Sequence, residues 1–147
     1  MLRGWSSLER QLVFELSRLT PAQPRIFAIA SGPELAFPLT RKLHGTSVGR
    51  APFQWVSDGA ERLLASGALD AATRPQIETA ARLDRFEVAQ AIRDGRPDVI
   101  LVEGAARERW ALSHAEIAAA LSAYRKVKTI SDVQIWLPRQ PTAAKAP

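Results

Sequence analysis

The stretch Pro97-Asp98-Val99-Ile100-Leu101-Val102-Glu103-Gly104 decides the fold of this chain. Its four central residues are apolar and mostly β-branched, and turn-forming residues bound them on both sides. A short apolar run of this kind indicates a strand that is buried on both faces. Such a strand needs helices packed above and below its sheet, so the stretch predicts an α/β domain.

Helical and strand-like segments alternate on the N-terminal side of that run. Leucines at helical spacing follow the capping-box sequence Ser6-Ser7-Leu8-Glu9 and predict a helix over residues 7–19. The apolar run Arg25–Ala30 predicts a second core strand. The longest helix is predicted over residues 74–94, where a glycine follows at the usual C-cap position.

The remaining segments are shorter. The stretch Phe53–Val56 alternates aromatic and polar residues and predicts a short strand, whereas residues 105–112 are predicted to be irregular. A capping box at Ser113–Glu116 predicts a helix through Tyr124. The final segments, 126–130 and 133–137, flank Ser131-Asp132, which is a plausible two-residue turn, and they predict an antiparallel hairpin.

These elements predict an α/β fold in three layers. Its sheet of four or five strands is mostly parallel, and the C-terminal hairpin is antiparallel. Residues 1–138 are predicted to form a single domain. Residues 139–147 are rich in proline and poor in apolar bulk, so we expect a disordered tail.

The composition limits the classes of partner. The net charge is +5 and the isoelectric point is about 10.4, but the basic residues are scattered, which argues against a nucleic-acid partner. The absence of cysteine excludes disulfides and thiolate metal sites. No apolar run approaches the roughly 18 residues that span a bilayer. His44 and His114 lack companions at metal-ligand spacing, so neither a metal nor a cofactor is expected.

Two candidate sites follow predicted strands. Ser31-Gly32-Pro33-Glu34 comes after Arg25–Ala30, at a strand-to-helix junction of the kind that binds phosphate. Glu34 would repel an anion, so helix capping is the favoured interpretation. Glu103 ends the central strand, where open α/β sheets bind ligands. A carboxylate there can bind a ligand, act as an acid or base, or pair with an arginine such as Arg50, Arg107 or Arg109, and the ion pair is the favoured interpretation.

A third candidate combines aromatic and guanidinium groups. Arg50 can stack on Trp55, and together with Phe53 they would line a sugar site. Burial of Phe53 and Trp55 in the core is the favoured alternative.

The order of motifs resembles the C-terminal soluble domain of multi-span bacterial membrane glycosyltransferases, the mannosyltransferase-type proteins that use lipid-linked sugar donors. The resemblance is carried by Ala36-Phe37-Pro38, by the segment from Arg50 to Trp55, by Pro97–Glu103 and by Tyr124 before a basic hairpin. It covers about residues 6–138. Glu103 replaces the usual aspartate, and Trp55 follows Phe53 more closely than in the family.

The resemblance implies a non-catalytic accessory or binding domain, because the family's catalytic carboxylate lies near a first membrane span that is not in this sequence. Its partners would be the membrane-embedded region of a parent protein or a lipid-linked saccharide, whose acceptor or carrier head group it would position. It would then be extracytoplasmic (periplasmic), and otherwise cytoplasmic. Arg50, Trp55, Glu103, Ser31 and Glu34 are the candidate ligand-binding residues.

Two other classes stay open. One is a freestanding nucleotide- or phosphate-binding module or enzyme that uses Ser31, Gly32 and Glu103. The other is an interaction domain that uses the amphipathic first helix as its docking surface.

Overall fold

The computed structural model describes residues 2–51 and 53–139, with side chains from Ser7 onward. Within these residues the helices are α1 (Leu2–Leu19), α2 (Ala36–Lys42), α3 (Trp55–Ser66), α4 (Arg74–Gly95), α5 (Gly104–Ser113) and α6 (Ala115–Leu121). The strands are β1 (Arg25–Ile29), β2 (Thr46–Ser47), β3 (Val99–Glu103), β4 (Tyr124–Ile130) and β5 (Val133–Pro138). The predicted α/β class is confirmed.

The strands form one five-stranded mixed sheet in the order β2-β1-β3-β5-β4. The first three strands in this order are parallel, and β5 pairs antiparallel with both β3 and β4. The predicted central strand is therefore confirmed, with a neighbour on each side. The predicted hairpin is also confirmed, and Ser131 takes a left-handed φ of 56° in its turn.

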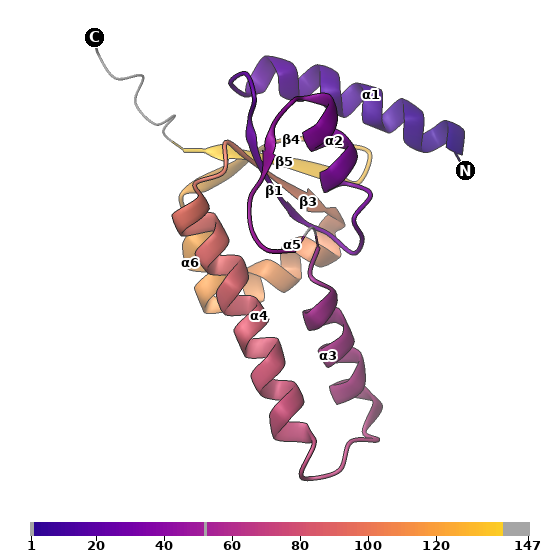
Figure 1. Ribbon diagram of the computed structural model, residues 1–147, viewed down its shortest axis with the longest axis vertical. Helices are drawn as coiled ribbons and strands as arrows, with labels where there is room; N and C mark the ends of the chain where they lie inside the picture. Colours follow the sequence, from indigo (N-terminus) through magenta and orange to yellow (C-terminus); the bar gives the residue numbers. More distant parts are fainter. Residues whose placement is uncertain (1, 52, 140–147) are drawn as a thin grey trace.

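Helices cover both faces of the sheet, giving three layers (Figure 1). On one face Ile100 and Val102 of β3 pack with α4, α5 and α6. On the other face Val99 and Leu101 pack against α1 and α2, and Leu12 is among the residues buried there. All four apolar residues of β3 are buried because each face of the strand has its own core.

Helix α1 belongs to the second of these cores. Leu12 and Leu16 are fully buried, and Leu8 and Leu19 are partly buried against the same cluster. The apolar stripe that would dock a partner is thus already covered by the chain itself. Among the described residues, no helix is both long enough and apolar enough to cross a membrane.

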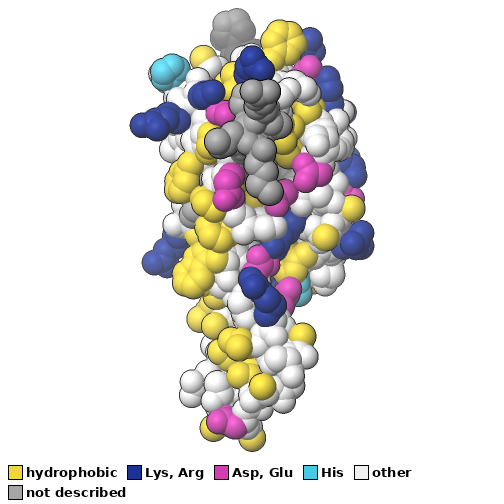
Figure 2. Space-filling view, turned by 90° about the vertical axis from the view of Figure 1, so that its right-hand side faces the viewer, with side chains coloured by type: hydrophobic (Ala, Val, Ile, Leu, Met, Phe, Trp, Pro, Cys, Tyr) yellow, Lys and Arg dark blue, Asp and Glu magenta, His cyan; other side chains and the backbone are white. Residues whose placement is uncertain are grey.

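Helices α3 and α4 form a hairpin that projects from the sheet (Figure 1). Small residues, Ala60 of α3 and Ala81 of α4, are buried in this hairpin. The projecting end shows few charged side chains in the face seen in Figure 2.

Four local predictions were wrong. The helix predicted over residues 7–19 begins at Leu2, so the predicted capping box at residues 6–9 lies inside α1 and not at its start. Phe53–Val56 is not a strand, because α3 begins at Trp55. Residues 105–112 are not irregular but belong to α5. The helix predicted through Tyr124 ends at Leu121, and Tyr124 begins β4. Tyr124 is drawn into the sheet because its ring is buried and its hydroxyl donates to the Pro97 carbonyl oxygen at 2.7 Å.

The predicted tail, residues 139–147, lies mostly outside the described residues. Its first residue, Arg139, is described and is bonded to the domain. The backbone N–H of Arg139 donates to the Ala123 carbonyl oxygen at 2.9 Å, and its Nε donates to the Ser122 carbonyl oxygen at 2.8 Å.

Candidate functional site

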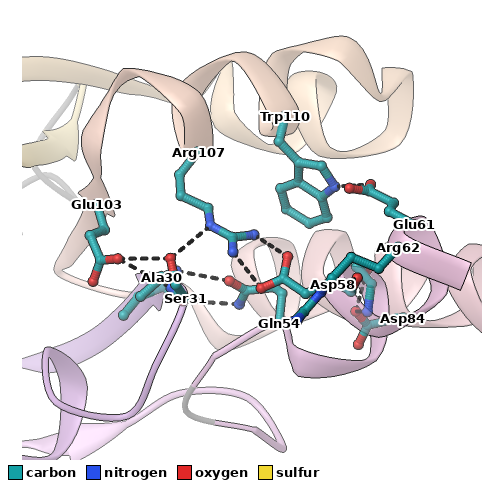
Figure 3. A network of polar contacts seen from close by, with 12 residues as sticks. Ala30, Ser31, Gln54, Asp58, Glu61, Arg62, Asp84, Glu103, Arg107 and Trp110 are labelled. Carbon is teal, nitrogen blue, oxygen red and sulfur yellow. Dashed lines mark hydrogen bonds and ion pairs between the residues drawn. The ribbon is translucent and has the colours of Figure 1, made fainter. Parts of the chain in front are cut away.

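Polar side chains meet at the carboxyl ends of β1 and β3. Ser31 follows β1, and Glu103 is the last residue of β3. Because these strands are parallel neighbours, both residues lie at the same edge of the sheet. The Ser31 hydroxyl donates to Glu103 Oε1 at 2.8 Å (Figure 3). The prediction that Glu103 stands at this strand end is thus confirmed.

Arg107 joins these residues to α3. Gly104 has a φ of 81°, so the chain turns directly from β3 into α5 and places Arg107 one helical turn beyond Glu103. The Arg107 Nε donates to Ser31 Oγ at 3.4 Å. Its two terminal nitrogens donate to the two carboxylate oxygens of Asp58, one of them at 2.6 Å.

This bidentate pair is largely shielded from water. The side chains of Arg107 and Asp58 are 13% and 17% exposed. Charge-assisted forked pairs of this kind fix geometry as well as adding energy. We call Ser31, Asp58, Glu103 and Arg107 the rim cluster.

Gln54 holds α3 beside the rim cluster. Strand β2 is short and pairs only with Arg25 and Ile26, so on that side the carboxyl end of β1 has no strand neighbour. The Gln54 side chain takes that place, since its Oε1 accepts the Ala30 N–H at 2.9 Å and its Nε2 donates to the Ala28 carbonyl oxygen at 3.1 Å. Gln54 is 3% exposed, so it substitutes for a strand partner in the interior.

Further polar contacts join α3 to α4 and α5. The Trp110 indole N–H donates to Glu61 Oε1 at 2.7 Å (Figure 3). The Ser57 hydroxyl and N–H both donate to Asp84 of α4, the latter at 3.0 Å. Trp110 also contacts His114 edge to face, with ring centroids 5.5 Å apart. Burial lowers the pKa of His114 below its usual value, and the nearby charge of Arg85 lowers it further.

Trp55 is exposed, so the favoured prediction that it lies in the core was wrong. It is the first residue of α3 and is 60% exposed. Residues three apart on a helix are neighbours, so Trp55 lies one turn from Asp58 of the rim cluster. Its exposure follows from the burial of Gln54 immediately before it, since adjacent residues at the start of the helix point in different directions. Phe53 is partly buried in the core, as expected.

Arg50 does not pair with Glu103. Its guanidinium contacts Glu87 of α4 at 3.0 Å, and its side chain is 83% exposed. Of the three arginines considered for Glu103, Arg107 is linked to it through Ser31. The Ser31 hydroxyl accepts from Arg107 and donates to Glu103, so the two charges do not contact directly. The favoured direct ion pair is replaced by a bridge through a hydroxyl.

The phosphate-binding geometry at Ser31–Glu34 is not formed. Helix α2 begins at Ala36, and its N-cap residue Leu35 makes no side-chain capping bond. The Glu34 carboxylate lies over Gly32, where an added Cβ would come within 2.2 Å of Oε2. An anion at this junction would therefore meet a negative charge already in place. The capping box predicted here is also absent.

Asp58 and Gln54 were not predicted from the sequence. Neither residue lies in a motif, and the partners of each are far away in sequence: Asp58 is 49 residues from Arg107, and Gln54 is 24 residues from Ala30. Among the described residues no group of three histidine, aspartate or glutamate side chains is arranged to hold a metal ion.

Comparison with protein-family models, with curated proteins and with solved structures gives no match to this chain, so its function has to be inferred from its own geometry. The fold and the rim cluster define the class of molecule: an α/β domain with a hydrogen-bonding cluster at the carboxyl ends of its parallel strands.

Proposed function

We propose that this chain is a binding domain that holds a saccharide head group at the rim cluster, beside the exposed ring of Trp55. The single observation that carries the proposal is the placement of a 60% exposed indole one helical turn from a bonded carboxylate–guanidinium pair at a strand-end edge. An aromatic face provides a surface for the apolar C–H face of a sugar, and charged side chains provide directed hydrogen bonds to its hydroxyls.

The rim cluster supplies acceptors as well as donors. The Ser31 N–H and hydroxyl both donate to Oε1 of the Glu103 carboxylate, and Ser31 is exposed. Oε2 of Glu103 is then available to accept a ligand hydroxyl, while the Arg107–Asp58 fork keeps Ser31 and α3 in position. This chemistry suits a neutral ligand rich in hydroxyl groups. A phosphate fits less well, because Glu34 and Glu103 both flank Ser31–Gly32.

The proposed setting is that of an accessory domain of a membrane glycosyltransferase-like protein, in which the bound saccharide would be an acceptor or the head group of a lipid-linked carrier. The support for this setting is the sequence resemblance. An extracytoplasmic location follows only from the same resemblance. A reading frame that continues upstream of Met1 into hydrophobic spans is the expected genomic result, and an in-frame stop codon directly upstream would contradict it.

Saccharide binding is tested with a panel of mono- and oligosaccharides, monitored by isothermal titration calorimetry and by NMR of the tryptophan indole N–H groups. The Trp55→Ala variant should lose binding while its melting temperature stays close to that of the unmodified chain, because the ring is exposed. Glu103→Gln should weaken binding. Phe86→Ala is the matched control, since Phe86 is also an exposed aromatic residue but lies on α4. Equal binding by Trp55→Ala and by the unmodified chain would contradict the proposal.

A further inference from the structure

A groove of about 920 Å³ lies between α1, α2 and the edge strand β2. The residues that matter for its chemistry are Phe37, Arg41, Lys42, His44 and Ser47. No residue of the rim cluster lines it. Pockets that bind small molecules typically measure about 300–1,000 Å³, so the groove has room for one.

Three basic side chains line this groove against one acidic residue. Lys42 Nζ pairs with Glu9 Oε1 at 3.0 Å, whereas no acidic side chain pairs with the Arg41 guanidinium among the described residues, and the His44 imidazole lines the groove beside it. The side chains of Arg41 and His44 do not cap α2, because backbone hydrogen bonds close its C-terminal end. The Thr40 carbonyl accepts the Gly45 N–H at 2.9 Å, and the Arg41 carbonyl accepts the His44 N–H at 3.2 Å.

His44 occupies a position that favours glycine. The two backbone bonds that close the end of α2 form a Schellman cap, whose left-handed residue is usually glycine. His44 fills that position with a φ of 51°. Any Cβ-bearing residue there lowers stability relative to glycine. Strained backbone positions cluster at functional sites, so the strain at His44 points to a function for the groove that it lines.

Strand β2 adds donors at the same place. The Thr46 N–H and the Val48 N–H both donate toward β1, to the Pro24 carbonyl at 2.9 Å and the Ile26 carbonyl at 2.8 Å. Since backbone N–H groups alternate in direction along a strand, the N–H of Ser47 points away from β1, toward the open edge. The Ser47 side chain lines the groove as well.

We propose that this groove binds a phosphorylated ligand, with the phosphate on Arg41, His44 and Ser47 and the organic part against Phe37. Guanidinium and backbone N–H groups are strong partners for phosphate oxygens. Phe37 is 54% exposed and forms, with Pro38, an apolar wall of the groove. The phosphate could belong to a soluble metabolite or to a phospholipid head group. This proposal does not rest on the saccharide site.

The first experiment measures binding of phenyl phosphate, inorganic phosphate and phenol to the full chain by NMR titration. Phenyl phosphate should bind more tightly than inorganic phosphate, and phenol should show no binding. The Arg41→Ala substitution should lower the affinity for phenyl phosphate by about tenfold, which corresponds to the loss of one charge-assisted contact. Arg125→Ala is the matched control, because Arg125 is an exposed cation on β4, at the opposite edge of the sheet.

The second experiment uses the strain at His44. His44→Gly should raise the melting temperature and weaken phenyl phosphate binding, so stability and binding move in opposite directions. Gln23→Gly is its control, because Gln23 has a left-handed φ of 55° and does not line the groove. It should raise the melting temperature and leave binding unchanged. Unchanged affinity in both Arg41→Ala and His44→Gly would overturn the proposal, as would the absence of binding by every phosphate probe.

The source of the phosphate is distinguished with vesicles. Sedimentation with phosphatidylcholine vesicles is compared with and without phosphatidic acid. Loss of phosphatidic acid-dependent binding in Arg41→Ala assigns the site to lipid head groups. Phenyl phosphate binding without vesicle binding assigns it to soluble phosphorylated molecules.

Discussion

Replacing Gln54 with alanine should destabilise the domain strongly, although glutamine is an ordinary surface residue in most proteins. At its carboxyl end β1 pairs with β3 on one side, and on the other side, beyond the short β2, the Gln54 amide bonds the Ala30 N–H at 2.9 Å and the Ala28 carbonyl at 3.1 Å. Ala28 and Ala30 are both buried, so water cannot replace the lost partners without local opening.

The size of the effect follows from those two groups. A buried donor or acceptor left without a partner costs about 1–3 kcal/mol. Two such groups give about 2–6 kcal/mol for Gln54→Ala. A domain of this kind has a total stability of about 5–15 kcal/mol, so the variant should be marginal or partly unfolded. Because α3 starts immediately after Gln54, the Arg107–Asp58 contact should loosen as well.

Urea unfolding followed by circular dichroism gives the free energy, and amide hydrogen exchange reports the local effect at Ala30. Gln90→Ala is the control, since Gln90 is exposed on α4 and its loss should change stability by less than about 0.5 kcal/mol. Gln54→Glu keeps one acceptor but introduces a charge into a buried site, so it should be less destabilising at low pH, where the carboxyl group is protonated. A loss below about 1 kcal/mol in Gln54→Ala, with unchanged protection of the Ala30 amide, would refute this reasoning.

Four further outcomes are expected. Val102→Asp should abolish the cooperative unfolding transition, because it buries an unpaired charge in the central strand; a folded circular dichroism spectrum would contradict this. A double-mutant cycle on Arg107 and Asp58 should show a coupling energy of at least about 1 kcal/mol, and simple additivity would mean that the fork contributes nothing. Because the pKa of His114 is lowered in the folded state, the unfolded chain binds the proton more readily, so stability should fall as pH drops below the ordinary value of 6.5; His114→Gln should lose less stability between pH 8 and pH 5, and equal losses would contradict the assignment. Deleting residues 1–20 should unfold the chain, since α1 supplies Leu12 and Leu16 to the core; a folded truncated domain would instead show that α1 is dispensable.

The sequence alone determined the elements whose evidence is local. The run Val99–Val102 is apolar on both sides of the strand, which requires a core on each face, and both cores are present. Residues 74–94 and the hairpin around Ser131-Asp132 were found because helical spacing and turn residues act over a few neighbours. Glu103 could be placed at the sheet edge because the end of a strand is also a local signal.

Only the tertiary structure decided what surrounds Glu103. Trp55 was expected in the core because it is a large aromatic residue, but Gln54 takes the buried position, on the side of β1 that β2 is too short to cover. Asp58 and Arg107 meet only because the hairpin of α3 and α4 stands next to α5. Composition and spacing describe what one segment prefers, whereas contacts across 49 or 72 residues depend on how the segments pack. That packing, rather than any motif, brings the rim cluster together.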